Sequence, residues 1–276
     1  MGTSELTTST NSKNGGAFAD LETFCVFIGY PRSGHSLIGS LLDAHPNIVI
    51  AYKRDALKDM EKGFKAERIQ NRLLENSQAS AQAGRVSRER INGLLTGKTL
   101  YSFAVHNQWQ GKFQKLRVIG YNRGGTTTQR LRSNPQLLES FKRTFDLKTK
   151  FVHVVRNPYD NISTISYRKG LSLADSINFY FSLCETVKSV TEQLASSDLF
   201  ELRHETFVDR PQVKLKELCH FLGQDAPQDY LDDCAVIVHK SPHQSRHDAS
   251  WDQDSIGLVK KRIAEFSFLQ GYSFQN

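Results

Sequence analysis

Short apolar runs along the chain alternate with segments whose apolar side chains recur at helical spacing. The first run, TFCVFIGY at residues 23–30, is rich in aromatic and branched side chains and ends at a turn signal, which is typical of a buried strand. We expect further strands at 48–50, 116–120, 151–155 and 199–203, and helices at 36–44, 55–90, 135–145, 158–168, 173–195, 211–222, 228–238 and 255–270. Alternating strands and helices predict a three-layer α/β/α fold with a central parallel sheet, whose ligands lie beyond the carboxyl ends of the strands.

The N-terminal segment differs in composition from the rest of the chain. Residues 1–20 are dominated by Ser, Thr, Asn and Gly, which predicts a disordered tail ahead of a single domain at 21–276. The longest apolar run, Phe24 to Ile28, is far shorter than the ~20 residues that cross a bilayer. No signal-peptide core is present in the tail, so we expect neither secretion nor anchoring. The four cysteines form no CxxC pair, which indicates buried free thiols in a reducing compartment such as the cytoplasm.

Charge is distributed unevenly along the chain. Lys and Arg number 36 against 29 Asp and Glu, a net charge of +7. Between Arg90 and Leu138 there is no acidic residue, but there are eight basic ones: Arg90, Lys98, Lys112, Lys115, Arg117, Arg123, Arg130 and Arg132. Such a field favours an anionic partner. The alternative is a solvated surface whose acidic partners lie nearby in space.

Three histidines invite a search for a metal site. His239, His243 and His247 follow one another at intervals of four residues. Pro242 lies within this run and argues against the single helix that would align the three rings. We therefore expect a solvated loop there and no metal.

A candidate phosphate-binding turn follows the first strand. The sequence reads Gly29-Tyr-Pro-Arg-Ser-Gly34-His35-Ser36 immediately before a predicted helix. The spacing is that of G-x-x-x-x-G-K-[ST], with His35 in place of the lysine. Backbone N–H groups and the partial positive charge of a helix N-terminus hold a phosphate in such a turn. Arg32 can supply the charge of the missing lysine, while close backbone packing is the structural alternative.

The missing lysine bears on the class of enzyme. An ATPase or kinase needs that lysine at the β- and γ-phosphates, and a carboxylate at a later strand end to hold Mg²⁺. The later strands end in Gly120-Tyr121-Asn122 and Arg156-Asn157-Pro158, with Asp160 close by but no acid directly at either end. These ends disfavour metal-assisted nucleotide hydrolysis. A kinase with a degenerate loop remains the rival enzyme.

A second basic strand end occurs at Arg156. It is followed by a predicted helix that carries hydroxyl groups at Ser163 and Thr164. Arg156 and one of these hydroxyls could hold a second phosphate. The alternative is a surface ion pair between Arg156 and Asp160. Two separate phosphate sites suit a nucleotide with phosphates at both ends.

These motifs resemble the sulfotransferase family, whose members use 3′-phosphoadenosine 5′-phosphosulfate (PAPS). FIGYPRSGHSLIGSLLDAHPNI is similar to the family's 5′-phosphosulfate loop, and VVRNPYDNIST to its 3′-phosphate segment. LRHETFVDRP at 202–211 and SWDQ…LVKKRIAEFSFLQGY also resemble family segments. The resemblance spans about Phe24 to Tyr272 and is weakest at 53–115.

The resemblance implies a residue-by-residue assignment of the donor site. The 5′-phosphosulfate is expected on Arg32, Ser33, Gly34, His35 and Ser36. The 3′-phosphate is expected on Arg156 and on Thr164, eight positions later, where the family more often has serine. Arg246, in the loop before Trp251, is a further candidate for that phosphate.

The resemblance also implies in-line transfer of the sulfuryl group from PAPS to a nucleophilic oxygen or nitrogen. Arg32 and the loop N–H groups are placed to stabilise the charge that grows on the bridging oxygen. Many family members use a Glu after the second strand or a His after the third as the base. Here Lys53 occupies the first position and the His is absent. The candidate bases are Asp55, His106 and Tyr121, although Asp55 could instead cap a helix.

The acceptor is expected to be a small molecule bound between the region 53–115, predicted to be helical, and the loop 239–253. Aromatic side chains could line this pocket or simply belong to the core: Tyr101, Phe103, Trp109, Phe113 and Trp251. We expect a cytoplasmic tailoring enzyme, a monomer or homodimer, without nucleic acid or membrane partners. The remaining alternatives are a nucleic-acid-binding module and a PAPS-binding protein with weak or lost activity.

Overall fold

The computed structural model describes residues 16–91, 94–239 and 241–276, with the backbone alone at 89–91. Five strands form the central sheet in the order β2 (Ile48–Ala51), β5 (Val118–Tyr121), β1 (Thr23–Gly29), β6 (Lys148–Val155) and β7 (Leu199–Arg203). All of their pairings are parallel. The five predicted strands and the parallel α/β fold are therefore confirmed.

Both faces of the sheet are buried. Successive side chains of a strand point to opposite faces. In β1, Phe24, Val26 and Ile28 pack into one apolar core, whereas Cys25 and Phe27 pack into the other. Burial on both sides explains why this strand reads as an uninterrupted apolar run. All four cysteines are buried free thiols, as predicted.

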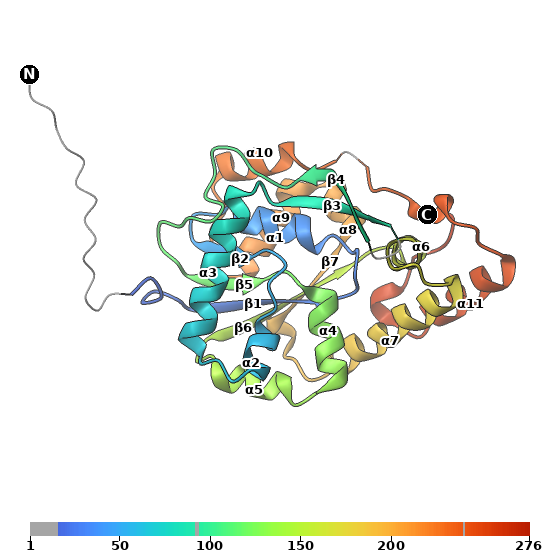
Figure 1. The fold of residues 1–276 in the computed structure, drawn as a ribbon, viewed down its shortest axis with the longest axis horizontal. Coiled ribbons are helices and arrows are strands. Elements are labelled where there is room, and N and C mark those ends of the chain that lie inside the picture. The colour runs from blue at the N-terminus through green and yellow to red at the C-terminus, as the bar shows by residue number, and fades with distance from the viewer. Residues whose placement is uncertain (1–15, 92–93, 240) are drawn as a thin grey trace, which may run out of the picture.

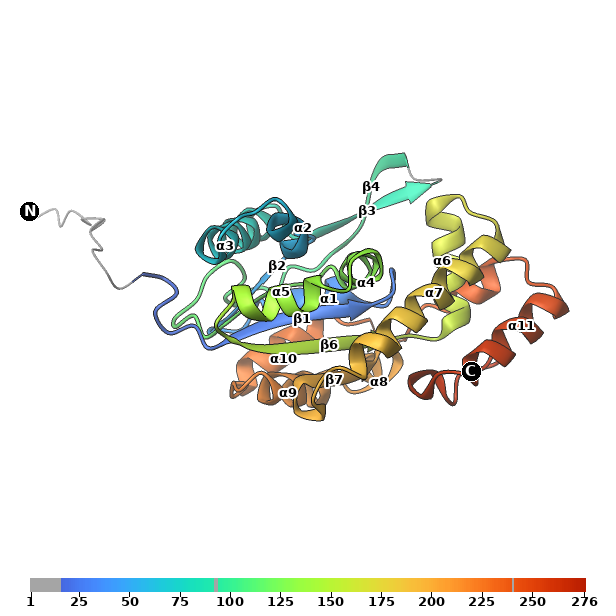
Figure 2. The same cartoon turned by 90° about the horizontal axis from the view of Figure 1, so that it is seen from below.

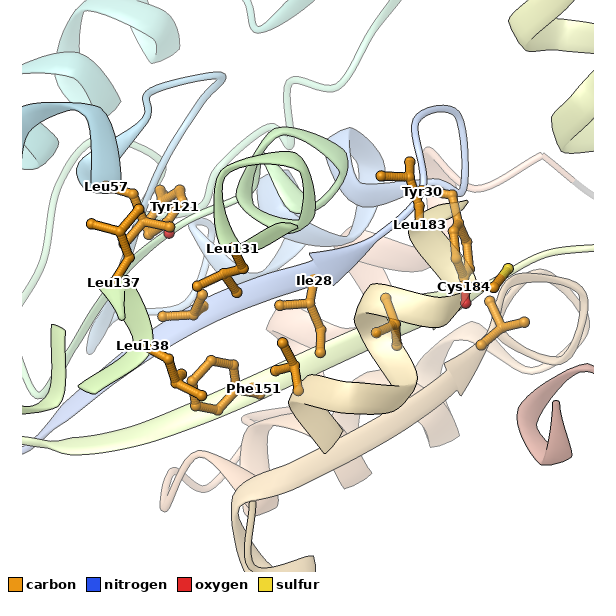
Figure 3. Packing of buried hydrophobic residues seen from close by; sticks show 14 of the residues in the cluster. Ile28, Tyr30, Leu57, Tyr121, Leu131, Leu137, Leu138, Phe151, Leu183 and Cys184 are labelled. Atoms are coloured by element: carbon orange, nitrogen blue, oxygen red, sulfur yellow. The ribbon is translucent and has the colours of Figure 1, made fainter. Parts of the chain in front are cut away.

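Helices form the two outer layers. One face carries α4 (Gly124–Ser133), α5 (Leu137–Thr144) and α7 (Leu173–Thr191), and the other carries α1 (His35–Leu42), α9 (Pro211–Phe221) and α10 (Gln228–Val236), as Figure 2 shows. Figure 3 shows Leu131, Leu138 and Leu183 of the first layer against the sheet. The remaining helices are α2 (Ala56–Glu61), α3 (Ala66–Gln82), α6 (Pro158–Lys169), α8 (His204–Asp209) and α11 (Gln253–Ile263). Single 3₁₀ turns lie at Ser196–Asp198, Ser245–Asp248 and Ser267–Leu269.

The predicted helix at 55–90 is wrong beyond Gln82, and so is the helical character of the 53–115 region there. An antiparallel hairpin of β3 (Val86–Ile91) and β4 (Leu94–Ser102) follows α3 instead. Its strands pair with each other rather than with the central sheet, and β4 is largely exposed. Exposed strands with charged side chains lack the apolar signal that marks a buried strand.

The hairpin, α6 and the C-terminal segment gather beyond the carboxyl ends of the central strands (Figure 1). Residues 1–15 of the predicted tail lie outside the described residues, which begin with a turn at 16–20 whose Phe18 packs against the core. None of the described helices combines the length and the apolar character needed to cross a membrane.

Candidate active site

The turn between β1 and α1 needs its glycines. Gly29 has φ +128° and Gly34 has φ +99°, a region that other residues rarely adopt. A Cβ atom on Gly29 would lie 3.2 Å from the Val154 carbonyl oxygen, and one on Gly34 would lie 2.5 Å from Nδ1 of His204. Arg32 adopts a positive φ of 75° without being glycine. The turn at residues 29–36, the phosphate loop below, is therefore tightly wound and held by its surroundings.

Side chains from the other strand end hold the carbonyl groups of the phosphate loop. Nδ2 of Asn161 donates to the Pro31 carbonyl at 3.0 Å and to the Ser33 hydroxyl at 2.9 Å. Nη1 of Arg156 donates to the Arg32 carbonyl at 3.1 Å. The first N–H groups of α1 have no partner within the helix, and no side chain caps them. An anion can therefore bind these N–H groups while the carbonyls face the protein.

Arg156 lies at the end of β6, where Asn157 caps α6 by accepting from the Tyr159 N–H at 3.0 Å. The Asn157 N–H in turn donates to Oε1 of Glu205 at 2.8 Å. The Arg156 side chain is buried, and its Nη2 donates to the His243 carbonyl. Its Nε has no hydrogen-bond partner among the described residues. Burial lowers the pKa of Arg156, so this cation lacks the solvation that it would have in water.

The hydroxyl of Ser245 lies between Arg156 and Thr164. Its Oγ is 3.0 Å from Oγ1 of Thr164 and 3.5 Å from Nη2 of Arg156. Thr164 Oγ1 also donates to the Asp160 carbonyl at 2.8 Å. The predicted partners Arg156 and Thr164 are therefore brought together, with a serine oxygen at the point that both contact.

Arg246 completes this end of the site. Its side chain is 1% exposed, and its Nη1 lies 2.7 Å from Oδ2 of Asp160. The alternative pairing of Arg156 with Asp160 is thus wrong, because Arg246 takes that carboxylate. Nε and Nη2 of Arg246 are buried without partners among the described residues.

His35 occupies the lysine position of the loop, but its imidazole faces inward. Nε2 of His35 lies 3.2 Å from the Ile28 carbonyl oxygen. A Cβ atom on Gly124 would lie 2.5 Å from this Nε2, so the ring is closely enclosed. Burial lowers the pKa of His35 to about 4, so the ring is neutral at neutral pH. The imidazole is therefore no substitute for the cationic lysine, and His35 has its backbone N–H to offer an anion.

Arg32 and Ser36 present side chains at the outer side of the loop. Arg32 is exposed, although burial of its surroundings and the charges of Arg168 and Arg156 lower its pKa. Ser36 is half-buried, and its hydroxyl lowers the pKa of the nearby Tyr52. Arg32 thus carries its cation on the exposed side of the loop, while its own carbonyl is held by Arg156.

Two of the candidate bases are engaged elsewhere. Asp55 accepts from the Lys58 N–H at 3.0 Å as the cap of α2, and its Oδ2 lies 2.7 Å from Nε of Arg130. Tyr121 is fully buried against Phe24, and burial raises its pKa well above the usual value. The capping alternative for Asp55 is therefore confirmed, and Tyr121 is a core residue closed to an acceptor.

Aromatic side chains extend from the loop toward the hairpin. The ring centroids of Tyr52 and Phe103 are 6.5 Å apart, those of Phe103 and Tyr101 are 5.8 Å apart, and those of Tyr101 and His239 are 6.1 Å apart. The third candidate base, His106, is exposed in the segment after β4.

The other predicted pocket aromatics pack elsewhere. Nε1 of Trp251 donates to the Ser163 hydroxyl at 2.9 Å beneath α6. Phe113 and Trp251 pack against the main core, so the core alternative fits these two side chains. The backbone N–H of Trp109 donates to the Ala44 carbonyl beyond the last turn of α1.

Several basic residues of the acid-free stretch have acidic partners from other parts of the chain. Lys115 pairs with Asp20 at 3.0 Å, Arg117 pairs with Glu22, and Arg130 pairs with Asp55 and Glu61. The alternative of a solvated surface with acids nearby in space is confirmed for these residues.

The three evenly spaced histidines have different neighbours. His243 Nδ1 lies 3.0 Å from Ser245 Oγ, whereas His247 packs on Phe274 and His239 on Tyr101. Over the described ranges, no group of three or more His, Cys, Asp or Glu is placed to hold a metal ion.

Sequence reasoning missed five residues that shape the site. Asn161, His204 and Glu205 stand inside the quoted motifs, so their proximity to strand ends was a usable signal. Ser245 directly precedes the predicted Arg246, which was a signal of the same kind. Thr128, whose Oγ1 accepts from the Gly29 N–H of the phosphate loop at 2.9 Å, carries no such signal and reaches the site through the fold alone.

Comparisons with known proteins agree with this geometry. A family model described as "Sulfotransferase family" matches residues 25–228. The sulfotransferase domain of the olefin synthase of Synechococcus PCC 7002 is 16% identical, over 88% of this chain and 94% of that chain, with a TM-score of 0.51. A sulfotransferase of Mycobacterium avium is 9% identical, over 90% and 77% of the two chains, with a TM-score of 0.50.

At such low identity these two structures show a shared fold. No curated protein sequence matches the chain. The family match covers most of the domain and includes both strand ends described above. The chain therefore belongs to the sulfotransferase family and is a sulfotransferase enzyme.

Proposed function

We propose that this sulfotransferase moves the sulfuryl group of PAPS to a hydroxyl, amine or amide group of a small-molecule acceptor, leaving adenosine 3′,5′-bisphosphate (PAP). One observation carries the proposal: the buried cation Arg156 bonds directly to the carbonyl of Arg32, so the two anion-binding segments are in contact. Such proximity lets one nucleotide reach both. The buried N–H groups of Arg156 and Arg246 without partners among the described residues support a second phosphate there.

The donor would bind in two parts. The N–H groups at the start of α1, together with Arg32 and Ser36, would hold the 5′-phosphosulfate. Arg156, Arg246 and Thr164 would hold the 3′-phosphate. The Ser245 oxygen already makes contacts with Arg156 and Thr164 like those of a phosphate oxygen, so its segment shifts or joins in when the nucleotide binds.

Arg32 would perform the main chemical task. As the bond from sulfur to the bridging oxygen breaks, negative charge grows on that oxygen, and a preorganised cation with N–H groups stabilises it. The kinase alternative places a lysine at this end of the loop. His35 is neutral and turned toward the Ile28 carbonyl, which weakens that alternative.

Three residues are candidates for the base that takes the acceptor's proton. Of the three candidates, His106 is the one whose side chain is exposed, whereas Asp55 caps a helix and Tyr121 is buried. An amine or amide acceptor makes different demands on a base than an alcohol does. The half-exposed rings near the loop support an apolar or aromatic small molecule, and the buried thiols fit a cytoplasmic setting.

Thermal unfolding with PAP, ATP and ATP–Mg²⁺ tests the donor. We expect PAP to raise the midpoint without Mg²⁺, since a ligand at 100 times its Kd stabilises by about 2.7 kcal/mol. A rise with ATP–Mg²⁺ and none with PAP would support the kinase. Mass spectrometry then looks for an added SO₃ across a panel of acceptors, and binding without product would support the inactive alternative.

Replacing the loop cation tests the catalytic role. Arg32→Ala should lower kcat by about 10²–10³-fold, as loss of an oxyanion donor does, while the protein still binds PAP. Arg132→Ala, on the outer side of α4 where it bonds to Ser182, is the matched control. Near-normal turnover of Arg32→Ala would show that the role is misassigned.

A further inference from the structure

Three polar side chains, Tyr30, His153 and Glu201, form a relay that leads to the phosphate loop. The Tyr30 hydroxyl lies 3.0 Å from Nε2 of His153, and Nδ1 of His153 lies 3.3 Å from Oε2 of Glu201. His153 is paired in register with Ile28 of β1 and with Glu201 of β7. Tyr30 and His153 are fully buried, whereas the Glu201 side chain is 49% exposed and borders a cavity of about 370 Å³.

The charge of Glu201 determines which group of each contact donates a proton and which accepts it. The interaction with His153 lowers the pKa of Glu201, so its carboxylate is ionised. Nδ1 of His153 makes no well-directed hydrogen bond among the described residues, so the carboxylate 3.3 Å away favours a proton on Nδ1 through its charge. Nε2 is then left as an acceptor for the Tyr30 hydroxyl, whose pKa burial raises well above its usual value. The nearby Tyr180 and Cys184 of α7 are kept neutral by burial in the same way. Figure 3 shows Tyr30 beside Cys184.

The series of contacts from Glu201 through His153 to Tyr30 ends in the phosphate loop itself. Tyr30 follows Gly29 directly, and its carbonyl accepts from the Ser33 hydroxyl at 3.2 Å. A Cβ on Gly29 would lie 3.4 Å from Cδ2 of His153, so the imidazole also bounds the loop sterically. The positive φ of Arg32 makes the loop costly to form, and such conformations persist where the surroundings hold them. Orientation of the Tyr30 ring therefore bears on the whole loop.

We propose that Glu201 and His153 are positioning residues: through Tyr30 they hold the backbone N–H groups of the phosphate loop in the arrangement that binds the donor. The link to the donor rests on the proposed function. Neither residue touches the nucleotide. A carboxylate that orients an imidazole, which in turn orients a third group, is a known way of fixing a tautomer and a geometry at a distance.

Substitutions at the two ends of the relay test the proposal. Glu201→Gln keeps the size of the half-exposed side chain and removes its charge, and Tyr30→Phe removes the hydroxyl. Each should raise the Kd for PAP about three- to tenfold, the worth of one hydrogen bond. The double variant should lose no more affinity for PAP than the weaker-binding single variant loses, because both substitutions act through His153. Glu217→Gln, which borders the same cavity and pairs with Lys214, is the matched control.

Hydrogen exchange in the unliganded protein gives a second readout. Amides of residues 29–36 should exchange faster in Glu201→Gln and Tyr30→Phe than in the wild type and in Glu217→Gln. Unchanged exchange in Glu201→Gln, or losses of affinity that add in the double variant, would overturn the proposal. If the wild type itself fails to bind PAP, the proposed function fails, and the exchange data alone decide the role of Glu201.

Discussion

Single residues show how this site accommodates a buried cation. Among the described residues, the hydrogen bonds of Arg156 go to neutral oxygens: the carbonyls of Arg32 and His243 and the hydroxyl of Ser245. Arg246, by contrast, has the carboxylate of Asp160. Asp160 and Glu205 act on Arg156 through their charges, but neither carboxylate bonds to it, and a phosphate would supply such a direct opposite charge. Arg156 is thus the residue whose environment gains most from an anionic ligand.

Arg156→Met should weaken PAP binding by about 30-fold or more, since losing one partner of a buried charge pair costs on the order of 2–5 kcal/mol. Adenosine 5′-monophosphate, which lacks the 3′-phosphate, serves as the control ligand. Its Kd should rise by a smaller factor than that of PAP, because Arg156 also holds the Arg32 carbonyl of the phosphate loop but meets the 3′-phosphate in PAP alone. Isothermal titration calorimetry measures both, and equal losses for the two nucleotides would contradict the assignment.

At the scale of elements, one buried ion pair joins the base of the hairpin to the sheet. Arg85, just before β3, donates to Asp43, which follows α1. Oδ1 of Asp43 accepts from the Ile50 N–H of β2 at 2.6 Å and from the Ser77 hydroxyl of α3 at 2.7 Å. Its Oδ2 accepts from the Gly111 N–H at 2.9 Å. Four segments of the chain therefore depend on one carboxylate.

Arg85→Met should lower the free energy of unfolding by about 3–5 kcal/mol, because it leaves Asp43 buried without its counter-ion. Adding Asp43→Asn should recover part of that loss, since the neutral amide needs no cation. Urea unfolding of the two variants gives the comparison. A double variant less stable than Arg85→Met would mean that the hydrogen bonds of Asp43 outweigh its charge.

At the scale of the whole molecule, the buried histidines link stability to pH. Burial lowers the pKa of His35 to about 4 and that of His204 to about 3. The unfolded chain takes up these protons near pH 6.5, so the stability that both contribute is present above that pH and is lost on acidification. Burial raises the pKa of Asp43 to about 6, so the stability that this carboxyl contributes increases on acidification. The loss from the two histidines is larger than this gain from one carboxyl.

The free energy of unfolding should therefore fall as the pH drops from about 6.5 to 4. His35→Gln should reduce this fall by on the order of 3 kcal/mol, since each pKa unit corresponds to about 1.4 kcal/mol. Urea unfolding at several pH values in this window tests the expectation. A slope that is the same in the variant and in the wild type would assign the pH dependence to other groups.

The local sequence pattern was sufficient to predict the strands of the sheet, the phosphate loop and the family. A buried parallel strand needs a continuous apolar run, and a turn wound like that at 29–36 needs glycine at fixed places, so both leave a mark in the sequence. Helix α4 was not predicted, because its first half, GGTTT, consists of residues of low helix propensity. Its packing against β1 stabilises it instead.

The choice of partners lay beyond the reach of any local pattern. Asp160 is four residues from Arg156 yet pairs with Arg246, and Asp55 pairs with Arg130 across the fold. His35 stands in the lysine position yet turns toward Ile28. Charges and hydrogen bonds select among neighbours in space, and the order of the strands sets which distant segments become neighbours. Spacing along the chain could therefore locate both anion-binding segments, whereas their direct contact emerged from the packing of β1 beside β6.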